Sequence, residues 1–470
     1  MDGSKKANVT FGGLLALLLA IRIYGITTDF WLDEIWVLNS LEQLQGFGEI
    51  FTRFRFPSNH LLNSFWMFAI YPQEGWMLYR LLSVISGCAL LLLIWRQKNP
   101  RTRNFELLFV GGSYAMIILT SEARGYASLV FFSYAAWRCL PDLNRMSGKT
   151  VLLFALCCGL GVLSQATFVF FLGGIGALYL TQACLADARK EALMNAVRIL
   201  FIPFSCFVAV YLLFYQHLEP IIPKEIPYLA CLLTTIEHLF GQDQTAPFMR
   251  WNLLLIFVIT NGVILWHLWK RDRPQAVFYL VTVWLLPIAV IVLKDPKYFQ
   301  PRYFIVPLLF YLVHLARVFT ETWDRRNRRI LHVTLLVIYF AGQLPGILAF
   351  ATHGRGGYSV IARSIADGTL RGSNYASNVD FINSMVLQYY LKREGVEETF
   401  RAAPLNQADT YFYLNTHLPG EDFHPVAPAG FRPLAVQTFP SAPFANYTVV
   451  IYSRLPLWPP GGLVPNGPTR

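Results

Sequence analysis

Eleven apolar segments of helical length, separated by short polar connectors, occupy the first 350 residues. A helix crosses the hydrocarbon core of a membrane with about 20 mostly apolar residues, because lipid offers no hydrogen-bond partner to an exposed peptide group. The pattern therefore predicts a polytopic α-helical membrane protein. We expect the spanning helices at 9–27, 76–96, 105–120, 126–140, 150–165, 168–184, 199–215, 251–269, 275–293, 303–320 and 330–350.

The composition agrees with this prediction. Of the 470 residues, 55% are hydrophobic and 14% are charged, and the mean hydropathy is +0.42. A soluble globular domain carries about 25% charged residues. The scarcity of charge along the whole chain therefore excludes both a water-soluble globule and an intrinsically disordered chain.

The net charge of +11 would suggest nucleic-acid binding in a soluble protein. Here the basic residues are scattered over connectors, whereas a nucleic-acid surface needs them on one folded face. Basic connectors mark the cytoplasmic side of a membrane protein. We therefore predict no nucleic-acid partner, a cytoplasmic amino terminus, and cytoplasmic connectors at 96–103, 138–149, 189–198, 270–273 and 317–329.

The C-terminal region, 351–470, is less apolar and rich in Gly, Pro and Asn. A helical pattern at 380–392 precedes strand-like runs at 409–414 and 446–453. Eleven spans that start from the cytoplasm leave this region outside the membrane. We predict two domains, a transmembrane domain at 1–350 and a small extracytoplasmic α/β domain at 351–470.

Cysteine and histidine usage argues against metal and disulfide chemistry. All seven cysteines precede the C-terminal region and nearly all lie in apolar spans, so the outer domain has no disulfide to form. The nine histidines are scattered, and the chain contains neither an HExxH nor a CxxC motif. The sequence therefore predicts no metal site.

Polar residues gather on the face opposite to the basic connectors. The first outer loop, 28–75, begins with the acidic pair Asp33–Glu34. It continues with an amphipathic stretch at 35–54, which is suited to lie as juxtamembrane helices on the membrane surface. The other candidate residues in this loop and in three outer turns are Arg55, Asn59, His60, Glu122, Arg124, Tyr126, Gln165, Lys297, Arg302 and Tyr303.

An acidic pair and several arginines suit phosphate chemistry at a membrane surface. An aspartate can take the proton of an attacking hydroxyl group, and arginine offers a fixed fork to phosphate oxygens. Each residue alone also fits a structural role, Asp33 as a helix cap and Arg124 or Arg302 as a cation that extends to the interface. Their coincidence on one face favours a substrate with its phosphate at the interface and its tail in the bilayer, such as a polyprenyl-phosphate sugar.

These features resemble the C-type (GT-C) superfamily of membrane glycosyltransferases that use polyprenyl-phosphate sugars. The most similar branch is that of the protein O-mannosyltransferases and the aminoarabinose transferase acting on lipid A. The resemblance covers roughly 1–350 in order and topology and implies the GT-C fold. The segments that carry it are Asp33–Glu34 with the surface helix after it, Pro57 with Asn59–His60, Arg80–Leu–Leu–Ser83, Glu122–Ala–Arg124–Gly–Tyr126 and Pro301–Arg302–Tyr303.

The resemblance implies a role for each candidate residue. Asp33 would be the base that activates the acceptor, and Glu34 would orient the acceptor or the base. Gln165 stands where many relatives place a histidine, which leaves the sugar or acceptor contact at this turn open. The donor-phosphate ligands would be Arg124, Arg302, Lys297 and Arg55. The substrate-binding residues would be Asn59, His60, Glu122, Tyr126, Gln165 and Tyr303.

The implied reaction is a single displacement with inversion at the anomeric carbon. The donor carries one phosphate, so arginine can replace a divalent metal, and we predict no obligatory cofactor. The acceptor would be a hydroxyl group of a glycolipid, a glycan or a protein. We expect a monomer in the bacterial inner membrane, in contact with lipids, with its C-terminal domain in the periplasm.

Three other interpretations stay open at this point. A ligase or polymerase of the same fold would use a lipid-diphosphate oligosaccharide and favour a more cationic outer loop. A transporter of lipid-linked sugars would place polar residues at mid-membrane depth in symmetric halves. A structural membrane partner would use its outer domain only for binding. The amphipathic segment at 226–240 fits either a substrate entrance or a packing helix.

Overall fold

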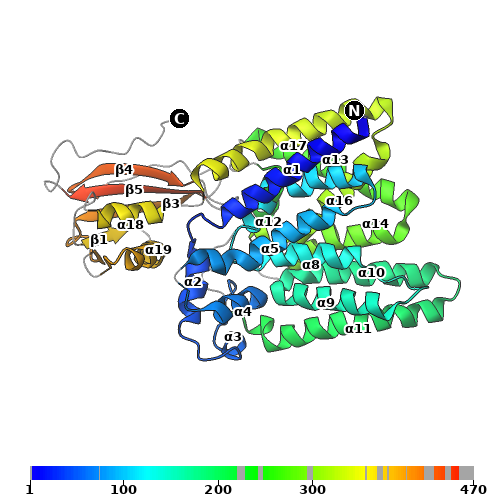
Figure 1. Ribbon diagram of the computed structural model, residues 1–470, viewed down its shortest axis with the longest axis horizontal. Helices are drawn as coiled ribbons and strands as arrows, with labels where there is room; N and C mark the ends of the chain where they lie inside the picture. Colours follow the sequence, from blue (N-terminus) through cyan, green and yellow to red (C-terminus); the bar gives the residue numbers. More distant parts are fainter. Residues whose placement is uncertain are drawn as a thin grey trace. The chain divides into compact units, whose positions relative to one another are not determined.

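The computed structural model divides the chain into two compact units (Figure 1). The helical unit comprises Met1–Ile26 and Ser40–Ile347, and the C-terminal unit comprises Thr27–Asn39 and Leu348–Arg470. The structure describes residues 3–73, 75–219, 228–241, 247–293, 300–354, 357–367, 374–377, 380–397, 400–417, 428–439 and 446–454.

All eleven segments that the apolar pattern predicts to span the membrane are largely helical. The longer helices before the C-terminal region are α1 (Gly3–Gly25), α2 (Leu32–Leu41), α4 (Leu61–Ile70), α5 (Trp76–Trp95), α8 (Tyr126–Arg138), α9 (Gly148–Ser164), α10 (Val169–Leu185), α11 (Arg189–Leu213), α12 (Tyr228–Leu239), α13 (Pro247–Arg271), α16 (Ile305–Thr322) and α17 (Arg326–His353).

Shorter helical pieces connect or extend these helices. Two of them, η1 and η4, are π-helical, and η2, η3 and η6 are 3₁₀ turns. The shorter pieces are α3 (Glu49–Thr52), α6 (Pro100–Glu106), η1 (Leu107–Gly111), α7 (Tyr114–Leu119), η2 (Ala166–Phe168), η3 (Tyr215–His217), α14 (Arg273–Leu280), η4 (Val281–Leu285), α15 (Leu286–Leu293) and η6 (Pro301–Phe304).

Length and composition identify seven spans within the described residues. The predicted spans 9–27 and 150–165 coincide with apolar helices that are shorter, 126–140 coincides with α8, and 105–120 is divided among α6, η1 and α7. The chain is therefore a multi-pass helical membrane protein. The seven long apolar helices are Trp76–Trp95, Ala166–Leu185, Arg189–His217, Phe248–Arg271, Arg273–Leu293, Pro301–Thr322 and Arg329–Thr352.

The helix α16 forms the centre of the helical unit. In the most apolar stretch of the span that contains α16, 89% of the residues are buried inside the protein, whereas the corresponding value is 22% for the spans that contain α11 and α17. Most apolar side chains of α11 and α17 are therefore available to lipid. Phe310 on α16 stacks on Phe171 of α10 at 5.5 Å and meets Phe278 of α14 edge-on at 4.9 Å. Trp137 of α8 stacks on Phe278 at 4.4 Å. Aromatic side chains from four helices thus fill the core.

A break between η1 and α7 interrupts the predicted span at 105–120. Backbone groups freed by a break inside an apolar bundle are costly unless another group pairs with them. The side chain of Gln343, on α17, supplies one such partner, because its Oε1 accepts from the Tyr114 amide at 2.7 Å. Its Nε2 donates to the carbonyl oxygen of Leu239, at the end of α12, at 2.9 Å. Arg22 of α1 donates to the Gly111 carbonyl at 3.1 Å.

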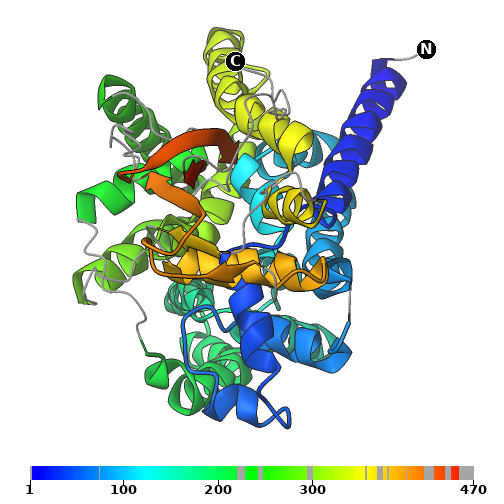
Figure 2. The ribbon, with the colours of Figure 1, turned by 90° about the vertical axis from the view of Figure 1, so that its left-hand side faces the viewer.

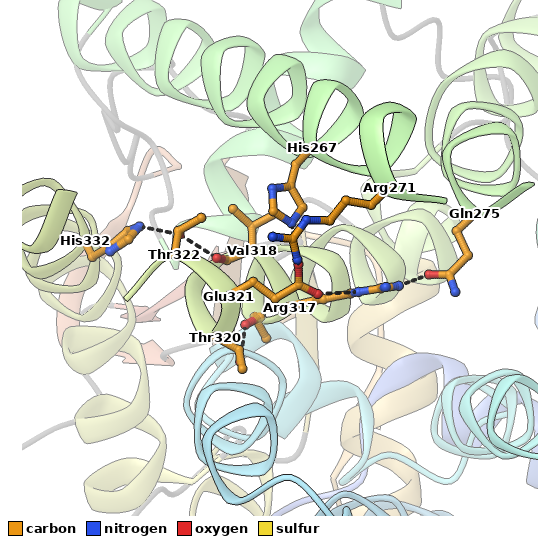
Figure 3. A network of polar contacts seen from close by, with 10 residues as sticks. His267, Arg271, Gln275, Arg317, Val318, Thr320, Glu321, Thr322 and His332 are labelled. Carbon is orange, nitrogen blue, oxygen red and sulfur yellow. Dashed lines mark hydrogen bonds and ion pairs between the residues drawn. The ribbon is translucent and has the colours of Figure 1, made fainter. Parts of the chain in front are cut away.

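A polar network ties together the ends of α13, α14, α16 and α17 (Figure 3). Glu321 accepts a hydrogen bond from Arg317 at 3.0 Å and another from Arg271, and lies 2.6 Å from Nε2 of His267. Arg317 also donates to Gln275. These groups lie where the charge pattern predicts the cytoplasmic ends of the helices, so the network is a structural tie apart from the candidate site.

The C-terminal unit contains a mixed five-stranded sheet in the order β2-β1-β3-β5-β4. The strand β1 is parallel to β2 and β3, whereas β5 is antiparallel to β3 and β4. Figure 2 gives a second view of these strands and of the two helices beside them. The elements are α18 (Tyr358–Ala366), β1 (Asn374–Ser377), α19 (Asp380–Arg393), β2 (Arg401–Ala402), β3 (Thr410–His417), β4 (Phe431–Phe439) and β5 (Asn446–Arg454).

The C-terminal unit has its own hydrophobic core. Tyr375 stacks on Phe400 at 5.3 Å and meets Phe412 edge-on at 5.6 Å. The helix α19 packs against α18 and β1. The expected helix at 380–392 and the expected strands at 409–414 and 446–453 correspond to α19, β3 and β5.

Candidate active site

The turn between α7 and α8 holds a buried ion pair. The Arg124 guanidinium lies 3.8 Å from a carboxylate oxygen of Glu122, and both side chains are 2% exposed. The same guanidinium lies over the ring of Tyr126 at 5.0 Å from its centroid. The carboxylate and the aromatic face both attract the guanidinium and favour this position of the cation.

The backbone of this turn is fixed by side chains from two other helices. Asn63 of α4 donates to the carbonyl oxygen of Ala123 at 2.6 Å, and Ser83 of α5 donates to the carbonyl oxygen of Arg124 at 3.0 Å. All of these residues are buried. The turn is therefore preorganised by hydrogen bonds to main-chain atoms, which do not depend on the identity of the turn side chains.

The structure brings three of the predicted polar segments together. His60, at the start of α4, meets the ring of Tyr126 edge-on at 5.0 Å. The turn after α9 lies against Gly125, since a β-carbon there would be 2.1 Å from the Ser164 carbonyl oxygen. Gln165 follows in extended conformation, and its Oε1 accepts from Thr167 at 2.9 Å. Residues far apart in the sequence thus form one end of the helical unit.

Asn59 has an evident structural role. Its Nδ2 donates to the carbonyl oxygens of Ile50 at 3.1 Å and Phe54 at 2.7 Å, and its Oδ1 accepts from Ser64 at 2.7 Å. The amide therefore closes the loop in front of α4. A substrate contact by Asn59 stays a prediction.

The remaining predicted phosphate ligands lie in other elements. Arg302 and Tyr303 are partly exposed in η6, which packs against α12 and α16. Arg55 is partly exposed in the loop after α3, and its carbonyl oxygen accepts from the Glu219 amide at 2.8 Å. Lys297 lies outside the described residues. The helix α12 occupies most of the amphipathic segment 226–240 and packs against η6.

The acidic pair occupies the first turn of α2, in the C-terminal unit. Glu34 is 1% exposed, and its Oε2 accepts from the Trp31 amide at 2.9 Å. A glutamate at this position that binds back to the residue before the helix is one half of a capping box, and it complements the helix dipole. Asp33 is partly exposed. The two carboxylates therefore differ in their surroundings. Glu34 is buried and stabilises the start of α2, whereas Asp33 is partly accessible to solvent.

Sequence reasoning missed the side chains that hold the site from behind. Ser83 appeared only as part of a motif, and Asn63 was given no role. The sequence contained a signal for such a supporting face, because Arg80, Ser83 and Gly87 recur at helical spacing in an apolar run. All three are buried in the structure. Arg80 donates to the carbonyl oxygen of Gly25 at 3.1 Å, at the end of α1.

In the ranges that the structure describes, no group of three or more His, Cys, Asp or Glu side chains is placed to hold a metal ion. The sequence-based expectation that no cofactor is obligatory stays a prediction.

Comparisons with known proteins give a match only among solved structures. No protein-family model matches the chain, and no curated protein matches it. Among solved structures, the chain is similar to ArnT from Cupriavidus metallidurans bound to undecaprenyl phosphate. The match covers 93% of this chain and 97% of that chain, at 12% sequence identity and a TM-score of 0.48. The catalytic and ligand roles given to individual residues stay predictions.

Proposed function

We propose that the chain is an integral-membrane glycosyltransferase that moves a sugar from a polyprenyl-phosphate donor to a hydroxyl group of an acceptor. The observation that carries the proposal is the buried guanidinium of Arg124, held by Glu122 and Tyr126 at the end of a bundle of apolar helices. A preorganised cation at that place can bind a phosphate whose lipid tail lies beside the helices.

The proposed reaction forms one bond and breaks one bond. The acceptor oxygen attacks the anomeric carbon and its proton passes to the carboxylate of Asp33. The bond between that carbon and the phosphate oxygen breaks, and polyprenyl phosphate leaves with one more negative charge. Arg124 and Arg302 are proposed to neutralise that charge, with Arg55 and Lys297 as further phosphate ligands. Glu34 is proposed to orient Asp33 through the helix start that it caps.

The acceptor class is a glycolipid, a glycan or a protein. A ligase or polymerase of the same kind differs only in its donor, which carries two phosphates. A transporter differs in kind, because it would move the lipid-linked sugar without breaking the bond to phosphate. Consumption of the monophosphate donor, of the diphosphate donor or of neither therefore separates the three functions.

The test uses membranes that contain the full chain and a radiolabelled polyprenyl-phosphate sugar. We expect Asp33→Asn to reduce transfer by at least about 100-fold while donor binding persists, because a general base contributes about 10²–10⁴ in rate. We expect Arg124→Ala to weaken donor binding and transfer together. The matched controls are Asp142→Asn and Arg145→Ala, which change exposed residues of one connector.

Full transfer by both Asp33→Asn and Arg124→Ala would overturn the assignment of these residues. Transfer from a polyprenyl-diphosphate donor, with none from the monophosphate, would instead identify the ligase or polymerase. Movement of intact donor across the membrane without transfer would identify a transporter.

A further inference from the structure

The segment that carries the acidic pair belongs to the same compact unit as the C-terminal region, although more than 300 residues separate them in the sequence. Asp29 makes the most direct connection. Its Oδ1 accepts from the hydroxyl group of Ser359 at 2.7 Å, and its Oδ2 accepts from the Ser359 amide at 3.0 Å. One carboxylate thus binds both donors of a single distant residue.

Ser359 is the second residue of α18, so its amide is one of the backbone donors that a helix start leaves without an intrahelical partner. The residue at the cap position, Gly357, makes no side-chain cap. Asp29 therefore caps α18 from outside the helix. A carboxylate at a helix amino terminus also complements the helix dipole.

Aromatic side chains reinforce this connection. The hydroxyl group of Tyr390 donates to the carbonyl oxygen of Phe30 at 3.0 Å, and the Phe30 ring stacks on Tyr389 at 6.1 Å. Trp31 packs on Tyr358 at 6.3 Å between ring centroids. Residues 29–31 thus contact α18 and α19 at three successive positions, through the side chains of Asp29 and Trp31 and through both the ring and the carbonyl oxygen of Phe30.

The held segment runs directly into the helix start that Glu34 caps. Trp31 packs on the C-terminal region and also donates its amide to Glu34. Asp33 lies between these two fixed residues in the first turn of α2. A displacement of α18 or α19 would therefore be transmitted to the Asp33 carboxylate through a short, fully anchored stretch of backbone.

We propose that the C-terminal region, 351–470, positions the acidic pair, with Ser359, Tyr358 and Tyr390 as positioning residues and Asp29 as the cap that docks the segment. The inference rests on the proposed function, since it takes Asp33 as the base. It makes the C-terminal region part of the catalytic architecture rather than an appended binding module. It also separates the carboxylates, because Asp29 is structural and Asp33 is catalytic.

The experiment compares Asp29→Asn, Asp29→Ala and Ser359→Ala in the full-length protein, with kcat and the donor KM measured separately. An error of about 1 Å in a catalytic group can reduce the rate about 100-fold. We expect Asp29→Ala and Ser359→Ala to lower kcat about 10-fold or more with an unchanged donor KM. Asparagine caps helices as well as aspartate, so Asp29→Asn should retain most of the rate.

The control is Ser364→Ala, which removes an exposed hydroxyl group elsewhere on α18 and should leave kcat unchanged. Tyr390→Phe removes one hydroxyl group without truncating a core side chain, and we expect it to lower kcat in the same direction. An Asp29→Asn variant as inactive as Asp33→Asn would overturn the inference, because Asp29 would then act as a carboxylate in the reaction.

Wild-type kcat in Asp29→Ala and Tyr390→Phe, with Asp33→Asn inactive, would overturn the inference and leave the proposed function intact. Full transfer by Asp33→Asn would overturn the base assignment itself. The two failures are therefore distinguishable within one set of variants.

Discussion

Gly125 packs directly on the backbone of Ser164, so that a β-carbon at Gly125 would lie 2.1 Å from the Ser164 carbonyl oxygen. The same β-carbon would lie 2.9 Å from the β-carbon of His60. Two turns and the start of α4 therefore meet at one glycine. The backbone of Gly125 is right-handed helical, so the requirement for glycine is one of space and not of conformation.

We predict that Gly125→Ala separates these segments. The obstructing atom is main chain and cannot rotate away, so the variant should lose about 1–3 kcal/mol in the free energy of unfolding, as overpacked sites do. Transfer should fall as well, because Arg124 is the adjacent residue. Thermal unfolding in detergent and the transfer assay measure the two effects.

The control for this substitution is Gly148→Ala at the start of α9, where a β-carbon meets nothing within 4 Å. It should be neutral or slightly stabilising. Equal free energies of unfolding and equal transfer in Gly125→Ala and Gly148→Ala would contradict the argument that Gly125 is closely packed.

Asn63→Leu should loosen the turn that carries Arg124. The substitution removes the hydrogen bond to the Ala123 carbonyl and leaves a buried acceptor unpaired, which costs about 1–3 kcal/mol. We expect a lower unfolding temperature and a raised donor KM. A matched control is Asn195→Leu, which removes an amide bond to the Leu143 carbonyl in a different turn. If both variants raised the donor KM equally, the link between Asn63 and the donor would be refuted.

Gln343→Leu should destabilise the helical unit through the break before α7. It removes the partners of the Tyr114 amide and the Leu239 carbonyl at once, so we expect a loss of about 2 kcal/mol or more. The control Thr352→Val changes an exposed residue of α17 whose hydroxyl group bonds within its own helix. Thermal unfolding in detergent should separate the two variants, and identical midpoints would show that the break does not depend on Gln343.

Glu321→Gln should release the network at the other end of the bundle. Its carboxylate accepts from Arg271 and Arg317, and hydrogen bonds to charged groups are worth about 1.5–3 kcal/mol each. We expect a lower unfolding temperature, a smaller difference at high salt, and an unchanged donor KM.

The comparison for Glu321 is Asp324→Asn, which breaks an ion pair with Arg101 whose two side chains are more than half exposed. Exposed pairs contribute about 0–1 kcal/mol. Glu321 is 21% exposed, whereas Asp324 is 73% exposed. A greater loss of stability in Asp324→Asn than in Glu321→Gln would therefore contradict the expectation that the less exposed carboxylate contributes more.

Some of the secondary structure could not be predicted because it departs from local patterns. The strand β4 contains Pro433, and its pairing shifts register between Pro433 and Ala435. Proline is accepted there because β4 is an edge strand. The short strand β1 has too few residues to show alternation. The amphipathic stretch at 35–54 is not continuous either, since α2 ends at Leu41 and α3 begins at Glu49.

The sequence by itself determined that the chain is a helical membrane protein and where its apolar helices run. Lipid selects for apolar length within each segment, and this property can be counted along the chain without knowledge of its neighbours. The polar turns could be recognised for the same reason, because charge against an apolar background is also a local signal.

Only the tertiary structure decided how those turns are held. The bond from Asn63 to Ala123, the contact of Gly125 with Ser164 and the cap that Asp29 places on α18 join segments far apart in the chain. Such contacts depend on which helix faces which and on individual backbone atoms. Hydropathy carries no information about either, so the division between the accessible Asp33 and the structural carboxylates beside it emerged from the fold alone.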